Sequence, residues 1–339
     1  MSNSNPTTLS DEQPVKSTIA LQLRTSVKGR LARVIIGIGL STTALYLSLR
    51  GLHFSDILAG FALADLRLIS IALVAVIINI ISKTIRWRAI LGNPGRKVSF
   101  LTLLRTLLLG QILNIVLPSR VGDVSRVYMI GSAGVGWPFV AGTIVTEKAI
   151  DLICYMLCFL LTLTLLPSLP GWVTTSVYSF FAITTIITAM FIALSHGYGL
   201  LDSRYLGWIP QALRNRVANI MQSINLSFMV VRRPWVAAQI IFWSFLVWTT
   251  AVLTNYLILC ALRIDAPAIS ALLLLIVLQI SISLPSVPGK IGLFQYACVL
   301  TLGLFGVSQT MAVNYGILLH IVAFLPIFFV GGMLFVIAR

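Results

Sequence analysis

The chain has 339 residues, of which 58% are hydrophobic and only 10% are charged, and its formal net charge is +15. Soluble domains carry about 25% charged residues, so this composition excludes a water-soluble globular protein and indicates lipid as the solvent. The basic residues lie between apolar segments rather than on one polar face, which excludes a nucleic-acid-binding surface. Pro and Gly interrupt several apolar runs, so we expect an all-α polytopic membrane protein.

The polar residues 1–32 are predicted to form a disordered cytoplasmic tail, and residues 33–339 a single transmembrane domain. Two regions of that domain, 100–146 and 268–308, are broken by Pro and Gly and are expected to form re-entrant hairpins. Residues 268–284 and 291–306 could each span instead, so the prediction is six to eight crossings. The six segments expected to cross the bilayer are 34–50, 68–86, 150–166, 173–195, 235–262 and 313–338.

The loops between these segments differ sharply in charge. One side carries 17 Lys and Arg residues, counting Lys83, Arg86 and Arg88 as loop residues. The other side carries four, which are Arg50, Arg67, Arg263 and Lys290. Positive charge accumulates in cytoplasmic loops, so both termini are predicted to lie in the cytoplasm of a bacterial inner-membrane protein. Five tryptophans near the expected span ends are assigned to an aromatic belt at the membrane surface: Trp87, Trp137, Trp172, Trp208 and Trp235.

A short motif occurs twice. Residues 117–123 read LPSRVGD and residues 284–290 read LPSVPGK, 167 positions later. Each half, about 33–167 and 168–339, reads as two spans, a broken hairpin and one more span. The first half starts in the cytoplasm and the second on the opposite side, so the two hairpins would enter from opposite faces. This pattern predicts an inverted repeat with a substrate site near the midplane of the membrane.

Ionisable residues inside the membrane need a partner or a role, because each costs about 2.5–3.5 kcal/mol to insert. Spacing places Arg120, Asp123 and Arg126 on one helical face. One interpretation is a cavity in which cations attract a phosphate headgroup while the acids orient them or accept a coupling proton. The other is internal neutralisation by the pairs Arg120–Asp123 and Lys148–Asp151. The remaining candidates are Glu147, Lys148 and Asp151 at the head of the third span, and Pro285, Gly289 and Lys290 at the second hairpin.

The other polar residues in apolar runs are expected to be structural. Asn79 and Asn114 are predicted to make interhelical hydrogen bonds, and His320 is interpreted as a residue of the helix bundle. The four cysteines form no C-x-x-C pair and are expected to pack as small apolar side chains. No P-loop, dinucleotide fingerprint or nucleophile elbow is present, so no cofactor and no enzymatic activity are expected.

Three motifs occur in order along the chain: Asn114-x-x-x-Pro118-x-Arg120-x-Gly122-Asp123-x-x-Arg126, then Glu147-Lys148-x-x-Asp151, then Pro285-x-x-Pro288-Gly289-x-x-Gly292-x-Phe294. In these motifs residues 30–339 resemble the UPF0104 membrane proteins, which share the transmembrane region of lysylphosphatidylglycerol synthase/flippase. The resemblance implies a protein that translocates or helps to modify lipids. The matched length leaves no room for a soluble synthase domain, so we do not expect lysyl transfer.

The resemblance also shows departures. The family commonly carries Glu where Asp123 stands, Arg at Lys148, and a loop ending in Glu where this chain has Lys290 and Gln295. The first two exchanges keep the charge, whereas the third makes the second hairpin more positive. This implies either a more anionic substrate or a different ion pair.

Three functions follow as hypotheses. The first is a flippase-like carrier of a phospholipid or lipid-linked headgroup, in which both hairpins matter. The second is an accessory subunit that presents lipid to a glycosyltransferase or lipid-modifying enzyme, or acts as a homo-oligomer. The third is a membrane-embedded transferase with Asp123, Glu147 or Asp151 as base, which would survive loss of the second hairpin.

Overall fold

The computed structural model describes residues 37–62, 64–117, 121–166, 233–283 and 287–336, together with a few isolated positions between 171 and 230. Its described elements are helices, and four of them are long and apolar enough to cross a membrane. They confirm four of the predicted spans. These helices are α3 (Leu66–Lys97), α6 (Trp137–Leu165), α9 (Pro234–Ala261) and α12 (Gln309–Val336).

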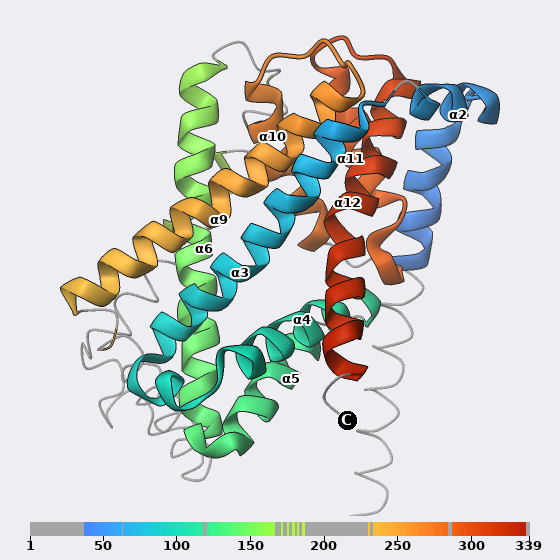
Figure 1. The fold of residues 1–339 in the computed structure, drawn as a ribbon. Helices are drawn as coiled ribbons and strands as arrows, with labels where there is room; N and C mark the ends of the chain where they lie inside the picture. The colour runs from blue at the N-terminus through green and yellow to red at the C-terminus, as the bar shows by residue number, and fades with distance from the viewer. Residues whose placement is uncertain are drawn as a thin grey trace, which may run out of the picture.

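The shorter elements either precede α3 or lie between the long helices (Figure 1). A short apolar helix, Gly37–Leu49, occupies the first predicted span. The fourth predicted span, 173–195, and the tail 1–32 lie outside the continuously described residues. The other short elements are α2 (Phe54–Ala62), α4 (Phe100–Val116), α5 (Val121–Ile130), the π-helical turn η1 (Gly131–Val135), α10 (Ile269–Ser283), the 3-10 turn η2 (Pro288–Lys290) and α11 (Leu293–Gly303).

Both broken regions fold as helical hairpins. In the first, α4 packs against α5, and in the second, α10 packs against α11, which follows the turn η2. Neither α4 nor α10 reaches the roughly twenty residues that a straight crossing requires. Figure 1 places the first hairpin near the end of the molecule where α3 ends, and the second towards the opposite end.

The centre of the molecule is an antiparallel pair of helices, α3 and α9. The N–H of Asp65, just before α3, donates to the carbonyl of Ala261 at the end of α9 (2.9 Å). Midway along the pair, the Asn79 amide donates to the Val247 carbonyl (2.6 Å) and the Thr250 hydroxyl (2.9 Å). This confirms the predicted interhelical role of Asn79. Such bonds matter in lipid because no water is available there to form a hydrogen bond with an unpaired amide.

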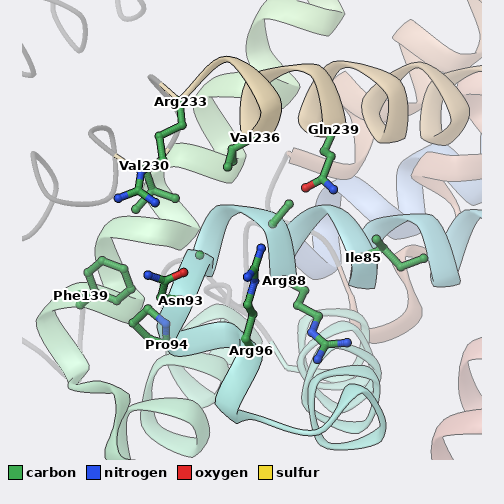
Figure 2. Close-up of a pocket in the computed structure, with 12 residues that line it drawn as sticks. Ile85, Arg88, Asn93, Pro94, Arg96, Phe139, Val230, Arg233, Val236 and Gln239 are labelled. Atoms are coloured by element: carbon green, nitrogen blue, oxygen red, sulfur yellow. The ribbon is translucent and has the colours of Figure 1, made fainter.

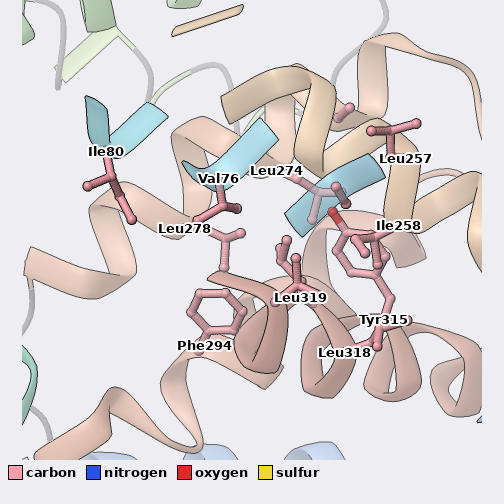
Figure 3. Packing of buried hydrophobic residues seen from close by; sticks show 14 of the residues in the cluster. Val76, Ile80, Leu257, Ile258, Leu274, Leu278, Phe294, Tyr315, Leu318 and Leu319 are labelled. Atoms are coloured by element: carbon pink, nitrogen blue, oxygen red, sulfur yellow. The ribbon is translucent and has the colours of Figure 1, made fainter. Parts of the chain in front are cut away.

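Buried apolar side chains from α3, α4, α5, α6, α9, α10, α11 and α12 form the core around this pair. Figure 3 shows Val76 and Ile80 of α3 packed near residues of α9, α10, α11 and α12. His320 belongs to this region, and the centre of its ring lies 4.9 Å from that of Phe294 and 4.3 Å from that of Phe324, as expected for a bundle residue. All four cysteines are free, and Cys298 is buried.

Two predicted boundaries are wrong. Helix α6 starts at Trp137 rather than near residue 150, because Gly136 (φ 92°) and Pro138 start a continuous helix there. Glu147 therefore lies about 15 Å inside the helix rather than at its head. Helix α3 continues beyond residue 86 to Lys97, so Lys83, Arg86 and Arg88 are helical and not loop residues.

Candidate functional site: a buried charge cluster

Seven charged residues from three helices gather on one side of α3. They are Lys83 and Arg86 of α3, Asp123 and Arg126 of α5, and Glu147, Lys148 and Asp151 of α6. We call this set the charge cluster. Helix α6 contacts both α5 and α3. Residues more than 60 positions apart in the sequence therefore meet here.

The centre of the charge cluster is the pair Arg126–Glu147. The guanidinium donates to both carboxylate oxygens, at 2.6 and 3.3 Å, and both residues are nearly inaccessible, at 4% and 6% exposure. A bidentate pair fixes both position and angle. In a site this dry each partner needs the other, since an isolated buried charge is far costlier than the pair.

The guanidinium of Arg126 also stacks on an aromatic ring. Its central carbon lies 4.1 Å from the centre of the Trp87 ring, and the Trp87 Nε1–H donates to the Thr143 hydroxyl at 3.3 Å. Trp87 is completely buried. Its assignment to the aromatic belt is therefore wrong, because α3 continues past it and α6 covers its indole.

The first hairpin supplies the outer edge of the charge cluster. Asp123 lies 3.7 Å from Arg126 and 3.8 Å from Lys148, which is the most exposed member of the described pairs at 44%. Asn114 accepts a hydrogen bond from the Gly122 N–H (2.8 Å), and its amide lies 3.4 Å from Asp123. Asn114 thus links α4 to the start of α5, as predicted for this residue.

Two glycines allow this hairpin to close. A Cβ at Gly122 would collide with the Gly110 carbonyl oxygen, and a Cβ at Gly110 would lie 2.7 Å from the Arg126 side chain. The backbones of α4 and α5 therefore touch at this crossing, as small residues permit in membrane helices. Arg126 is brought to Glu147 by this close approach.

On the other side of the charge cluster, Arg86 pairs with Asp151 at 2.8 Å and also donates to the Ser244 hydroxyl of α9 (3.3 Å). Arg86 is 1% exposed, whereas the Asp151 carboxylate is 23% exposed. Sequence reasoning missed Arg86 because it stands among the cations that follow the second apolar run. Its i,i+3 spacing from Lys83 on a continuing helix is the signal that could have found it.

The second hairpin bends sharply at its tip. Gly289 (φ 77°) and Lys290 (φ 59°) both adopt the left-handed conformation, which a lysine rarely does. The turn η2 contacts α4, so the tip of the second hairpin reaches the first hairpin. The Gln295 side chain accepts the Gly292 N–H at 2.8 Å, and a glutamate could accept the same bond.

Of the predicted site residues, the structure brings together six: Asn114, Asp123, Arg126, Glu147, Lys148 and Asp151. Gly289 and Lys290 lie in the other hairpin, at its contact with α4. Arg120 and Pro285 lie outside the described residues, and so does the predicted pair Arg120–Asp123. The ion pairs of Lys148 and Asp151 run to other helices, to Asp123 and Arg86, rather than to each other.

The chemistry available here is electrostatic. The charge cluster holds four cations and three acids, so it carries an excess of one positive charge when all seven are ionised. Arg86, Arg126 and Glu147 are buried and each takes part in an ion pair, whereas Asp123, Lys148 and Asp151 keep part of their surface exposed. Among the residues that the structure describes, no three His, Cys, Asp or Glu side chains are grouped as a metal would require.

Long apolar helices, two broken hairpins and a buried, paired charge cluster define a multi-pass α-helical membrane protein with a polar site inside the bundle. The chain belongs to the family described as the lysylphosphatidylglycerol synthase TM region, whose model matches residues 34–331. This confirms the resemblance found in the sequence and relates the chain to lipid handling in membranes. No curated protein matched the chain.

Proposed function

We propose that this protein is a flippase-like carrier that moves a lipid or lipid-linked headgroup across the membrane, and not an enzyme. The observation that carries the proposal is the charge cluster. Its residues Arg86, Arg126 and Glu147 are buried and paired, whereas the side chain of Lys148 is 44% exposed. Charged residues inside a membrane-spanning bundle are costly, and they commonly mark the path of a polar substrate. The excess positive charge favours an anionic headgroup.

The order of the helices supports an inverted repeat, which we propose together with the carrier. Helices α3, α4–α5 and α6 correspond in order to α9, α10–α11 and α12, and α9 starts 168 positions after α3. The two hairpins lie towards opposite ends of the molecule (Figure 1), and the tip of the second contacts α4 of the first. Broken segments in matching places of two inverted halves are the arrangement that carriers use for alternating access.

We further propose a bacterial inner-membrane location with both termini in the cytoplasm. The end of α3, with Arg96 and Lys97, and the start of α9, with Arg233, lie at one end of the molecule. Positive residues favour the cytoplasmic side. The first hairpin would then enter from the cytoplasm and the second from the opposite face.

The test is headgroup accessibility in liposomes that contain the purified protein. Fluorescent headgroup-labelled phosphatidylglycerol is placed in both leaflets, and a membrane-impermeant reductant bleaches the outer pool. The wild-type protein should expose the inner pool, whereas Lys148→Gln and Lys290→Asn should slow this exposure. Asn is chosen because it tolerates the left-handed conformation of residue 290. Arg67→Gln, at an exposed position at the opposite end of α3, is the matched control.

The outcomes separate the three hypotheses. Exposure that needs both Lys148 and Lys290 supports the carrier. A well-folded wild type that moves no anionic or zwitterionic lipid contradicts the carrier and favours the accessory subunit, to be sought by co-purification with an enzyme. Chemical turnover of the lipid that is lost in Asp151→Asn but survives in Lys290→Asn would identify a transferase.

A further inference from the structure

A pocket of about 660 Å³ lies apart from the charge cluster, between the kinked end of α3 and the start of α9 (Figure 2). Its described lining includes three arginines and no acid. None of these arginines forms an ion pair with an acid of the described residues. We call it the arginine pocket; its polar lining residues are Arg88, Asn93, Arg96, Arg233 and Gln239.

The kink in α3 creates this pocket. Gly92 adopts φ 62° and ψ −136°, and Pro94 follows two residues later. Only glycine takes that backbone conformation readily, and a Cβ at residue 92 would also lie 2.8 Å from Val230. Past the kink the chain changes direction, and Figure 2 shows the Arg96 side chain pointing from α3 towards α9. On the facing helix, Gln239 points into the same space.

The charge of the pocket selects an anion. Arginine guanidinium groups bind phosphate through paired N–H donors, and Asn93 and Gln239 add amide donors. No acid of the described lining neutralises these arginines, so their positive charge favours a bound anion. The space is several times larger than a phosphate ion, so the anion has room for substituents.

An apolar surface continues from the pocket along α9. A second hollow of about 260 Å³ is lined by Trp235, Ala238, Gln239, Phe242 and Trp243, and Gln239 belongs to both. Trp235 and Phe242 are 71% and 57% exposed. A ligand with a phosphate in the first hollow would therefore lay a hydrocarbon chain on the second.

We infer that the arginine pocket binds the phosphate of an anionic phospholipid, whose acyl chain lies along Trp235 and Phe242. This site is separate from the charge cluster, and the inference does not depend on transport. A lipid bound here would lie beside the end of α3 and the start of α9, at the end of the molecule proposed to face the cytoplasm.

Tryptophan quenching tests the inference, because bromine on an acyl chain quenches only nearby indoles. Vesicles of phosphatidylcholine that contain the full chain receive increasing brominated phosphatidylglycerol or, in parallel, brominated phosphatidylcholine. We expect extra quenching by the anionic lipid that saturates at low mole fraction. Arg96→Gln/Arg233→Gln should weaken its apparent affinity roughly thirtyfold, because each of the two cations contributes about 1 kcal/mol near a lipid surface. Trp235→Phe/Trp243→Phe should remove most of the extra quenching, because both indoles line the second hollow.

The controls make the result decisive. Arg50→Gln/Arg67→Gln removes the same charge from exposed positions elsewhere and should leave the quenching unchanged; Arg96→Lys/Arg233→Lys should recover part of it. Equal quenching by both lipids, or equal loss in the Arg50/Arg67 variant, would overturn the inference. Displacement by millimolar inorganic phosphate would show a site for free phosphate instead. Binding that persists in a protein without lipid movement would leave this inference standing and reject only the carrier.

Discussion

The guanidinium of Arg126 on α5 lies 4.1 Å from the centre of the Trp87 ring on α3, while it holds Glu147 on α6 by two hydrogen bonds. One side chain therefore joins three helices. The ring adds a cation–π contact to the ion pair, and such contacts gain most where water is absent. Arg126 thus joins the first hairpin to two of the long helices, α3 and α6.

Removing one partner of the central pair should destabilise the protein strongly. We expect Arg126→Leu or Glu147→Leu alone to lower the free energy of unfolding by about 3–5 kcal/mol, because each leaves a buried charge without its partner. The double variant Arg126→Leu/Glu147→Leu should recover much of this loss. Thermal unfolding in detergent, followed by size-exclusion fluorescence, measures the change. Equal losses in the single and double variants would mean that shape rather than charge pairing is responsible.

Replacing the ring should have a smaller effect. Trp87→Phe keeps an aromatic face but loses the hydrogen bond to Thr143, and Trp87→Leu also loses the cation–π contact. We expect a loss of about 1 kcal/mol for Phe and about 2 kcal/mol more for Leu. Trp235→Phe, at a largely exposed residue, should be neutral in the same melting experiment. If Trp87→Leu is neutral as well, the stacking contributes nothing.

The close crossing of the first hairpin gives a steric prediction. Gly122→Ala would drive a methyl group into the Gly110 carbonyl, so α4 and α5 must separate and Arg126 must move away from Glu147. We expect a loss of at least about 1–3 kcal/mol, as for other overpacked sites. Gly332→Ala is the matched control, because its Cβ would meet no atom within 4 Å. A Gly122→Ala protein as stable as the control would show that the crossing is loose.

The proposed orientation can be read by chemical labelling. With the native cysteines replaced by Ala, Lys97→Cys at the end of α3 should react with a membrane-impermeant maleimide in inside-out vesicles but not in intact cells. Arg263→Cys, just after α9, should show the opposite pattern, since α9 runs antiparallel to α3. The same labelling pattern for both residues would contradict the predicted crossings. Labelling of Lys97→Cys in intact cells and of Arg263→Cys in inside-out vesicles would place both termini outside the cytoplasm.

The sequence alone determined the class of the protein and most of its long helices. At least one end of each of the spans 68–86, 235–262 and 313–338 was located to within a few residues. A helix that crosses lipid needs a long run of apolar residues, and such a run is visible in the sequence. Pro and Gly likewise marked where the hairpins break. The sequence also selected Asn114, Asp123, Arg126 and Glu147, because charged and amide groups stand out against an apolar background.

Only the tertiary structure decided which charges belong together. Arg86 and Trp87 look like the end of a span in the sequence, yet α3 continues past them, and α6 and α9 cover them. Lys148 and Asp151, spaced to neutralise each other, pair with Asp123 and Arg86 instead. Local spacing fixes which residues share a helical face, but a partner across helices is chosen by packing. Here the packing depends on two glycines that let α4 and α5 touch.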